Sequence, residues 1–356
     1  MTSMHQRVRV DRALQISLQR SLHLGLQRLA AWVVALVTAL VTALVTALCL
    51  PLLAQAQGWD MPTGYAPTNF HTVNNVAFAE AVGKASGGKL AIKVHPGASL
   101  YKMPEIKRAV QQGQVPIGEV LMVTLVNENA LYGADGLPFL ANSYDSAKKL
   151  WSVQRPYIEK LLDAQGLMLM YAVPWPPQGL FVPKEVNAVA DMNGLNWRAY
   201  DKQTARMGEL FKARPVTIQA AEVAQALATG RINSLVSSAQ SGVDYKAWES
   251  VKFFYDVQAW LPKNMIIANK AAFNGLDKAL QGQLLAEARK AEEAGWASSV
   301  RTAESTKQTL ASNGMKVAAP GAKLAGELSA IGRQMVDEWL ATAGADGKSL
   351  VDAFRR

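Results

Sequence analysis

The sequence predicts an α/β protein with two lobes, in which a mostly parallel sheet is covered by helices on both faces. Short strand patterns alternate with amphipathic helix patterns along residues 57–356, as a layered α/β fold requires. A proline cluster at 174–177 interrupts an apolar strand, and one helical pattern over about 276–312 is too long for a single small domain. With 356 residues and 50% apolar side chains, the chain is large enough to form two cores.

The first 56 residues have the order of a secretory signal. Five arginines and one acid lie within residues 1–28, and an uncharged stretch covers residues 29–54. The small-residue A-x-A site that ends at Ala56 predicts a signal peptide that is cleaved after this residue. A permanent membrane anchor stays open, because about 25 apolar residues exceed the roughly 20 that a spanning helix needs. A lipid anchor on Cys49 is a third interpretation. The residue before it, Leu48, is bulky, whereas a lipid-modification site needs a small residue there, which argues against this interpretation.

The 300 residues left after cleavage carry a net charge of +5, against +9 for the whole chain, since five arginines and one aspartate leave with the signal. They contain no cysteine and only His71 and His95 as histidines, which excludes a Cys nucleophile, a disulfide framework and a multi-His metal site. The sequence has no phosphate-binding loop, dinucleotide fingerprint or nucleophile elbow. Basic residues are interspersed with acidic ones. We therefore expect no enzymatic activity, no metal, no cofactor and no nucleic-acid partner.

The first lobe is predicted from helix and strand patterns over residues 57–177. The apolar spacing predicts helices over Val73–Ala85, Pro104–Gln112 and Ser143–Gln165, and strands over Leu90–Val94, Val115–Val123 and Leu167–Val173. The prolines at 174–177 cannot continue a strand ladder, so we expect the chain to cross to the second lobe at this point.

The second lobe is predicted from the patterns that follow. Strands are expected over Leu195–Tyr200, Pro215–Ile218 and Val251–Val257, with a helix over Ala220–Thr229 that ends at Gly230. The helix over about 276–312 has roughly 35 residues and would span on the order of 50 Å, so we expect it to brace both lobes. The expected division is residues 57–177 plus about 265–285 for lobe I, and 178–264 plus about 315–356 for lobe II.

Arg198 is a charge whose position indicates a ligand. Strand alternation places Asn196, Arg198 and Tyr200 on one face, opposite Leu195 and Trp197. A guanidinium at such a position is partly desolvated and needs an anionic partner. The residues alone leave two partners open: a protein carboxylate in a salt bridge, or a ligand carboxylate held by a two-pronged hydrogen bond.

Six short motifs follow one another along nearly the whole mature chain. In chain order they are Phe78–Val82 with Ser86–Leu90, Val94–Gly97, Glu105-Ile106 with Gln111–Val115, Leu137–Phe139, Met192–Arg198, and Glu222–Gly230. Together they resemble the motifs of the DctP-type solute-binding proteins of TRAP transporters. The resemblance implies a two-lobed periplasmic binding protein fold, class II-like and of the TRAP type. It also implies that Arg198, which matches the arginine of the family's D-L-x-G-L-K-x-R pattern, binds the ligand carboxylate.

The chain departs from this family pattern at several positions. Gln178 stands where the family often has a second arginine, and Asn233-Ser234 replaces an Asp-Gly pair. A downstream asparagine that often contacts ligand appears as Ser237, and a histidine common near the end of the second lobe is replaced around Asn264. These changes argue against a dicarboxylate or a sialic-acid-like sugar acid.

A single arginine beside aromatic residues predicts a pocket with one charged end and one apolar end. We expect a monocarboxylate with an apolar or aromatic body, such as a 2-oxo or 2-hydroxy acid. The resemblance implies that the lobes close on this ligand by a hinge, with first-lobe residues completing the cage. The candidate ligand-binding residues are Arg198, Gln178, Trp175, Glu119, Asn69, His71, Ser237, Asn264 and Phe181. Plain core packing stays open for the aromatic residues, and a rim position for Glu119.

The resemblance also implies partners and a location. The partners are a small organic acid and the small and large integral membrane subunits of a TRAP transporter, and the location is the periplasm. A periplasmic receptor for a sensor kinase stays open, as does a dicarboxylate ligand. A secreted hydrolase is disfavoured, because the mature chain offers no nucleophile–base pair.

Overall fold

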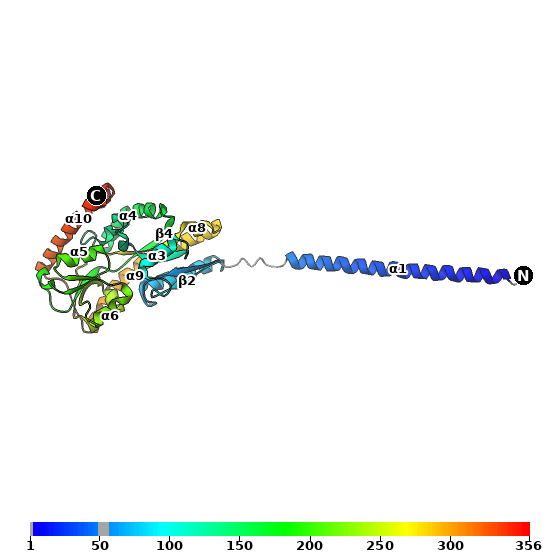
Figure 1. Cartoon of the computed structure of the whole chain (residues 1–356), viewed down its shortest axis with the longest axis horizontal. Helices are drawn as coiled ribbons and strands as arrows, with labels where there is room; N and C mark the ends of the chain where they lie inside the picture. Colours follow the sequence, from blue (N-terminus) through cyan, green and yellow to red (C-terminus); the bar gives the residue numbers. More distant parts are fainter. Residues whose placement is uncertain (1–2, 49–56) are drawn as a thin grey trace. The chain divides into compact units, whose positions relative to one another are not determined.

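The computed structural model describes residues 3–48 and 57–356, which fall into two compact units. The first is a single helix, α1 (Ser3–Leu48), blue in Figure 1. Within it, Ser17–Thr42 is the one segment of the described chain that is long and apolar enough to cross a membrane, with a mean hydropathy of 1.8. Its place near the N-terminus is that of a signal sequence. The expected cleavage after Ala56 and the residue Cys49 lie outside the described residues.

The first lobe of the second unit contains two small sheets. β1 (Gln57–Pro62) pairs in parallel with β2 (Leu90–His95). The other sheet has the order β3-β10-β4, with β3 at Ile117–Leu121, β10 at Lys263–Asn269 and β4 at Leu167–Pro174. The helices are α2 (Phe70–Ala85), α3 (Met103–Gln111), α4 (Tyr144–Asp163) and α8 (Lys270–Asn274), with the 3-10 helices η1 (Met122–Leu125) and η2 (Ala130–Gly136).

The second lobe is built on a six-stranded sheet of order β11-β9-β5-β8-β6-β7. Its strands are β5 (Gln178–Val182), β6 (Asn196–Ala199), β7 (Arg214–Thr217), β8 (Ser234–Ser238), β9 (Phe253–Tyr255) and β11 (Lys316–Ala318). Its helices are α5 (Lys202–Leu210), α6 (Val223–Ala228) and α7 (Ala239–Asp244), with the 3-10 helices η3 (Val189–Met192), η4 (Ala220–Glu222) and η5 (Ala247–Glu249).

The expectation of a mostly parallel sheet holds in part: β1-β2, β11-β9, β8-β6 and β6-β7 pair in parallel, but β10 and β5 run against their neighbours. β10 runs antiparallel to both β3 and β4, and β5 runs antiparallel to both β8 and β9. The physical reason is the return of the chain from the second lobe, which inserts β10 between two strands that the sequence places far earlier. Strand patterns read along the chain do not show where β10 is inserted, because it pairs with β4 residues 89 to 102 positions earlier.

The first-lobe core lies on both faces of the β3-β10-β4 sheet. Met265 and Ile267 of β10 pack with apolar residues of α4, whereas Ile266 and Ala268 pack with those of α2 and of α9 (Lys278–Ser312). This alternation at period two is the pattern of a strand buried on both sides. The β3-β10-β4 sheet is therefore covered by helices on both faces.

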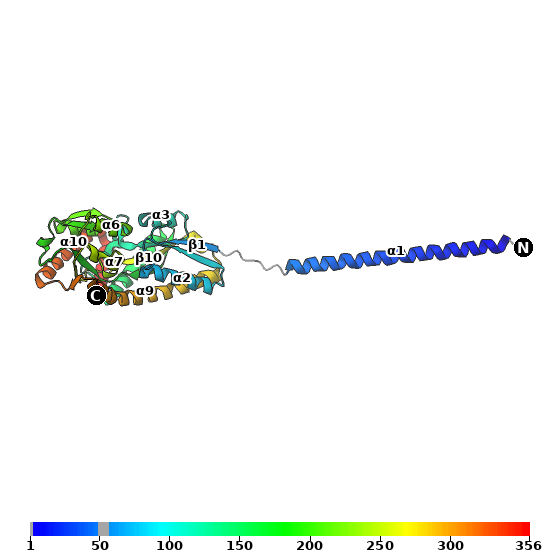
Figure 2. The same cartoon turned by 90° about the horizontal axis from the view of Figure 1, so that it is seen from below.

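Two long C-terminal helices contact both lobes. α9 packs against α2 and β4 of the first lobe and against α7 and β11 of the second, and Figure 2 shows it along one side of this unit below α2 and α7. α10 (Ala322–Arg355) is kinked at Gly344, whose φ of 65° is left-handed. The expectation placed residues 315–356 in lobe II alone. In the structure the first part of α10 packs there, but Val336, Trp339 and Leu350 pack with η2 and α4 of the first lobe.

Two crossing segments join the lobes side by side. The first is the proline cluster between β4 and β5, and the second runs from β9 to β10. The backbone N–H of Trp175 donates to the carbonyl of Pro262 at 2.8 Å, and the N–H of Gln178 donates to that of Trp260 at 2.9 Å. The two segments therefore form one hydrogen-bonded ribbon that connects the lobes.

Candidate functional site

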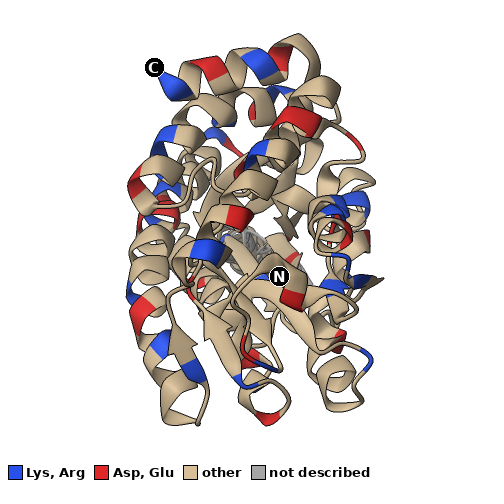
Figure 3. Cartoon of the chain, turned by 90° about the vertical axis from the view of Figure 1, so that its left-hand side faces the viewer, with Lys and Arg blue, Asp and Glu red and all other residues tan. Residues whose placement is uncertain are grey.

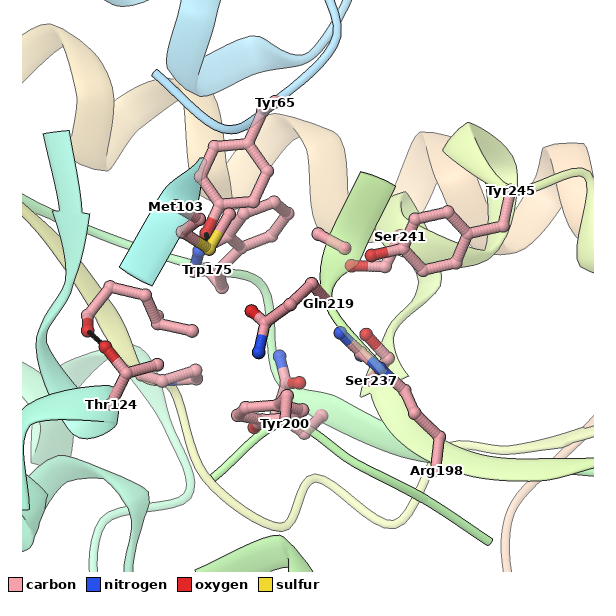
Figure 4. A pocket seen from close by; sticks show the side chains of 14 residues that line it. Tyr65, Met103, Thr124, Trp175, Arg198, Tyr200, Gln219, Ser237, Ser241 and Tyr245 are labelled. Atoms are coloured by element: carbon pink, nitrogen blue, oxygen red, sulfur yellow. Dashed lines mark hydrogen bonds between the residues drawn. The ribbon is translucent and has the colours of Figure 1, made fainter. Parts of the chain in front are cut away.

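A cavity lies between the lobes, beside this ribbon. The space between its lining atoms measures about 430 Å³, part of it open to solvent. Figure 4 shows Tyr65, Met103, Thr124 and Trp175 on one side and Arg198, Ser237, Ser241 and Tyr245 on the other. The remaining lining residues are Leu121, Gln178, Tyr200, Gln219, Ala220 and Pro262.

Arg198 is held in the cavity wall by the second-lobe sheet. It lies on β6 between β7 and β8, and the residue is only 4% exposed. Its Nε donates to the backbone carbonyl of Ile218 at 3.0 Å, and its guanidinium carbon is 4.9 Å from the centre of the Tyr200 ring. Within the described part of the chain, no Asp or Glu oxygen lies within 4.0 Å of the guanidinium. Of the two partners that the sequence left open, the salt bridge is therefore not formed, and the buried cation is free to bind an external carboxylate.

Neutral polar groups surround this cation. Ser237 on β8 and Ser241 on α7 line the same side of the cavity, and Tyr245 follows α7 directly. Burial raises the pKa of Tyr245, although the nearby charge of Arg198 acts in the opposite direction. Its hydroxyl therefore stays protonated at neutral pH, and this end of the cavity carries hydroxyl groups next to one positive charge.

The opposite wall is aromatic and comes from the first lobe and the crossing. The ring of Tyr65 meets that of Trp175 edge to face, with centroids 5.0 Å apart. The Trp175 indole Nε1 donates to Asn264 Oδ1 at 2.9 Å, and the Tyr65 hydroxyl donates to the same oxygen at 3.3 Å. Met103 completes this wall, with its sulfur 3.9 Å from the Tyr65 hydroxyl.

A buried carboxylate lies behind the aromatic wall. Asn264 Nδ2 donates to Glu119 Oε1 at 2.8 Å, and the Thr63 hydroxyl donates to Glu119 Oε2. Burial raises the pKa of Glu119 and lowers the pKa of His71 well below its usual value. His71 Nδ1 is 3.8 Å from Glu119 Oε1, and since its ring is neutral this contact is not an ion pair. Glu119 therefore orients Asn264 and does not itself reach the cavity.

The structure separates the nine residues singled out in the sequence. Four line the cavity: Arg198, Gln178, Trp175 and Ser237. Glu119, His71 and Asn264 lie behind the aromatic wall. Asn69 caps α2 and donates through Nδ2 to Asp244 Oδ2 of the second lobe at 2.6 Å. Phe181 is buried against Phe254 in the second-lobe core, so it packs in the core and does not line the cavity.

Several lining residues were missed in the sequence. Tyr65, Met103 and Thr124 come from loops, a helix start and a 3-10 helix, for which no periodic pattern predicts direction. Tyr200 carried a usable signal, because strand alternation puts it on the Arg198 face. Ser241 and Tyr245 carried another, since a spacing of four residues places both on one face of a helical turn.

Charged residues on the surface of residues 57–356 are of mixed sign. Figure 3 shows Lys and Arg interspersed with Asp and Glu over the face it presents. In residues 3–48 and 57–356, no group of three or more His, Cys, Asp or Glu side chains is arranged to hold a metal ion. The cavity at Arg198 is thus the place where geometry and charge both indicate a ligand.

Two lobes joined by a crossing ribbon, with a cavity between them that holds a buried cation, are the arrangement of a solute-binding protein. The family model of the bacterial extracellular solute-binding proteins, family 7 (DctP), matches residues 65–341, and the chain belongs to this family. The structure is similar to that of DctP6 from Bordetella pertussis, an extracytoplasmic solute receptor binding pyroglutamic acid. The two are 50% identical, with a TM-score of 0.83 over 84% of this chain and 99% of that one.

Two further relatives were found. A TRAP solute-binding protein from an unidentified marine microbe, specific for pyroglutamate, is 44% identical, with a TM-score of 0.83 over 85% of this chain and 99% of that one. A curated solute-binding protein from Albidiferax ferrireducens is 22% identical over 214 residues, which is 58% of this chain. That match spans 63% of the length of the curated relative.

Proposed function

We propose that this protein is the periplasmic solute receptor of a TRAP transporter and that it binds a small cyclic monocarboxylate, with pyroglutamate as the first candidate. The observation that carries the proposal is Arg198, a buried guanidinium with no carboxylate partner in the described residues. It is also the one Lys, Arg, Asp or Glu among the described residues that line the cavity. One fixed charge matches one carboxylate, whereas a dicarboxylate would leave its second charge without a cation.

The aromatic wall supports a ring as the rest of the ligand. With the carboxylate on Arg198, the body of the ligand extends toward Tyr65 and Trp175, which offer apolar ring faces. Pyroglutamate has one carboxylate and a five-membered lactam ring, and the similar receptors from Bordetella pertussis and from the marine microbe bind it. A micromolar ligand needs about 8 kcal/mol of net binding energy, which a desolvated charge pair and an enclosed ring can supply together.

Binding in this proposal closes the two lobes and involves no chemical step. Arg198 belongs to the second lobe and Tyr65 to the first, so one ligand contacts both. The closed form would then dock on the small and large membrane subunits of the transporter. The apolar helix near the N-terminus serves, in this view, as the export signal that is removed on the way to the periplasm.

A thermal-shift screen of the purified protein tests the proposal. The panel contains pyroglutamate, lactate, pyruvate, phenylpyruvate and succinate, each titrated over a wide concentration range. We expect pyroglutamate to raise the melting temperature in a saturable way, because a ligand that binds only the folded state stabilises it by mass action. The ligand should also be recovered unchanged after long incubation. Stabilisation by succinate and by none of the monocarboxylates would overturn the proposal.

A further inference from the structure

The hydrogen bonds behind the aromatic wall have a fixed direction. An indole N–H can only donate, so the Asn264 atom that lies 2.9 Å from Trp175 Nε1 is the amide oxygen. The amide nitrogen therefore faces Glu119 Oε1 at 2.8 Å, and it donates to that carboxylate. All three side chains are buried, which excludes water as a competing partner.

Paired strands hold this chain of contacts in place. Asn264 is the second residue of β10 and Glu119 lies on β3, and these strands are neighbours in the first-lobe sheet. The Thr63 hydroxyl donates to the second oxygen of Glu119, so the carboxylate has a donor on each side. A reversal of the Asn264 amide would set oxygen against oxygen at Glu119 and nitrogen against N–H at Trp175, which costs two buried hydrogen bonds.

The fixed orientation of the Asn264 amide affects the cavity through Tyr65. Its hydroxyl has one proton, and the two protein atoms within its reach in the described residues are both acceptors: Asn264 Oδ1 at 3.3 Å and Met103 Sδ at 3.9 Å. The proton is directed to the protein, so the oxygen presents its lone pairs to the cavity. The Trp175 N–H is likewise occupied by Asn264. This wall therefore offers the ligand an acceptor and no free donor from these two side chains.

We propose that Tyr65 is a specificity-determining residue that accepts a hydrogen bond from an N–H of the ligand, and that Asn264 and Glu119 are positioning residues that fix its oxygen as an acceptor. The inference rests on the proposed function and narrows it. Among cyclic monocarboxylates, the cavity selects a ring that carries a donor, such as a lactam, and rejects the lactone in which a ring oxygen replaces the N–H. An oxygen in that place would face the Tyr65 oxygen with no proton between them.

The test compares the affinities of the full chain for pyroglutamate and for its lactone counterpart, 5-oxotetrahydrofuran-2-carboxylate, by titration calorimetry. We expect the lactam to bind about 10-fold to 100-fold more tightly, the range that an unmade buried hydrogen bond gives. In Tyr65→Phe the preference should fall below about 3-fold, because the acceptor is gone and the ring remains. Tyr157→Phe is the matched control on α4, away from the cavity, and it should retain the full preference.

The positioning residues are tested by the same ratio. Glu119→Gln keeps an acceptor oxygen for Asn264 Nδ2, so it should retain the preference, whereas Asn264→Leu frees the Tyr65 proton and should reduce it. Equal binding of lactam and lactone by the unmodified protein would overturn the inference and leave the proposed function intact. Failure of both acids to bind would overturn the proposed function, and the inference with it. A full preference in Tyr65→Phe would show that another group selects the donor and would also overturn the inference.

Discussion

Replacing Arg198 with alanine separates an anchor for ligand from a structural charge. If the guanidinium holds the ligand carboxylate, Arg198→Ala should nearly abolish binding of pyroglutamate and leave the free protein folded. No protein carboxylate lies within 4.0 Å of this side chain in the described residues, so its removal breaks no internal ion pair. The internal hydrogen bonds that are lost are the contact from Nε to the carbonyl of Ile218 and the side-chain hydrogen bond with Tyr245.

The size of the effect follows from burial. Removing one partner of a buried, hydrogen-bonded charge pair costs about 2–5 kcal/mol, which is a loss of about 30-fold to about 5,000-fold in affinity. Arg198 is 4% exposed, so water cannot replace the missing cation, and we expect a loss of at least about 100-fold. Arg198→Lys keeps the charge without the planar fork and should lose less, about 10-fold.

Titration calorimetry measures the affinity, and urea unfolding without ligand measures the stability. Arg214→Ala is the matched control, because it removes an exposed arginine from the neighbouring strand β7. That control should leave the affinity within about 2-fold of the unmodified protein. The reasoning is refuted if Arg198→Ala binds pyroglutamate normally, or if it lowers the free energy of unfolding by the roughly 3–5 kcal/mol expected for a broken buried ion pair.

Three further predictions concern other polar and charged side chains. Lys263→Met should lower the free energy of unfolding by about 3–5 kcal/mol, because it leaves Asp135 buried without its cation. In urea unfolding, the addition of Asp135→Asn should restore part of this lost free energy. Burial raises the pKa of Asp201 from 3.8 to about 6. The contribution of this side chain to stability is therefore fully present below pH about 4 and is lost as the pH rises through about 6. Asp201→Asn should remove this fall in the free energy of unfolding when it is measured across that range. Asn69→Asp preserves the α2 cap but places a second carboxylate next to Asp244 of the other lobe. Calorimetry should show that the affinity for pyroglutamate falls by about 5-fold to 10-fold. An unchanged affinity would contradict a role of this contact in closure.

The sequence predicted the helices and strands better than their arrangement. The C-terminal end of α2 was predicted at Ala85, as observed, but its start was predicted at Val73 and lies at Phe70, where Asn69 caps the first turn. The sheet of the first lobe was not predicted: no strand was expected at β10, whose Asn264 pairs with Leu121 of β3, a partner far away in the sequence. A strand buried on both faces has the same apolar run whether its neighbours are parallel or antiparallel. The direction of β10 therefore depends on tertiary contacts that periodicity does not record.

The residues of the site were predicted from the sequence only where their role does not depend on which strands are neighbours. Arg198 could be identified in the sequence as a candidate, because strand alternation shows a charged residue among apolar ones whatever the partner strands are. The role of Glu119 could not be found, since a carboxylate becomes an internal hydrogen-bond partner only when β3 and β10 lie next to each other. A family motif places residues near a site, but it does not say which of them reach the ligand and which support a neighbour.

The crossing ribbon explains how a small ligand can act on two large lobes. Trp175, Gln178 and Pro262 all line the cavity, and all three lie on the segments that connect the lobes. The same residues exchange the backbone hydrogen bonds that hold the two segments together. A ligand can shift the equilibrium between the open and the closed state only if it binds one of these two states more tightly than the other. A ligand that contacts the ribbon, Arg198 on one lobe and Tyr65 on the other makes its full set of contacts in one lobe orientation alone, so loss of either end should weaken closure as well as affinity.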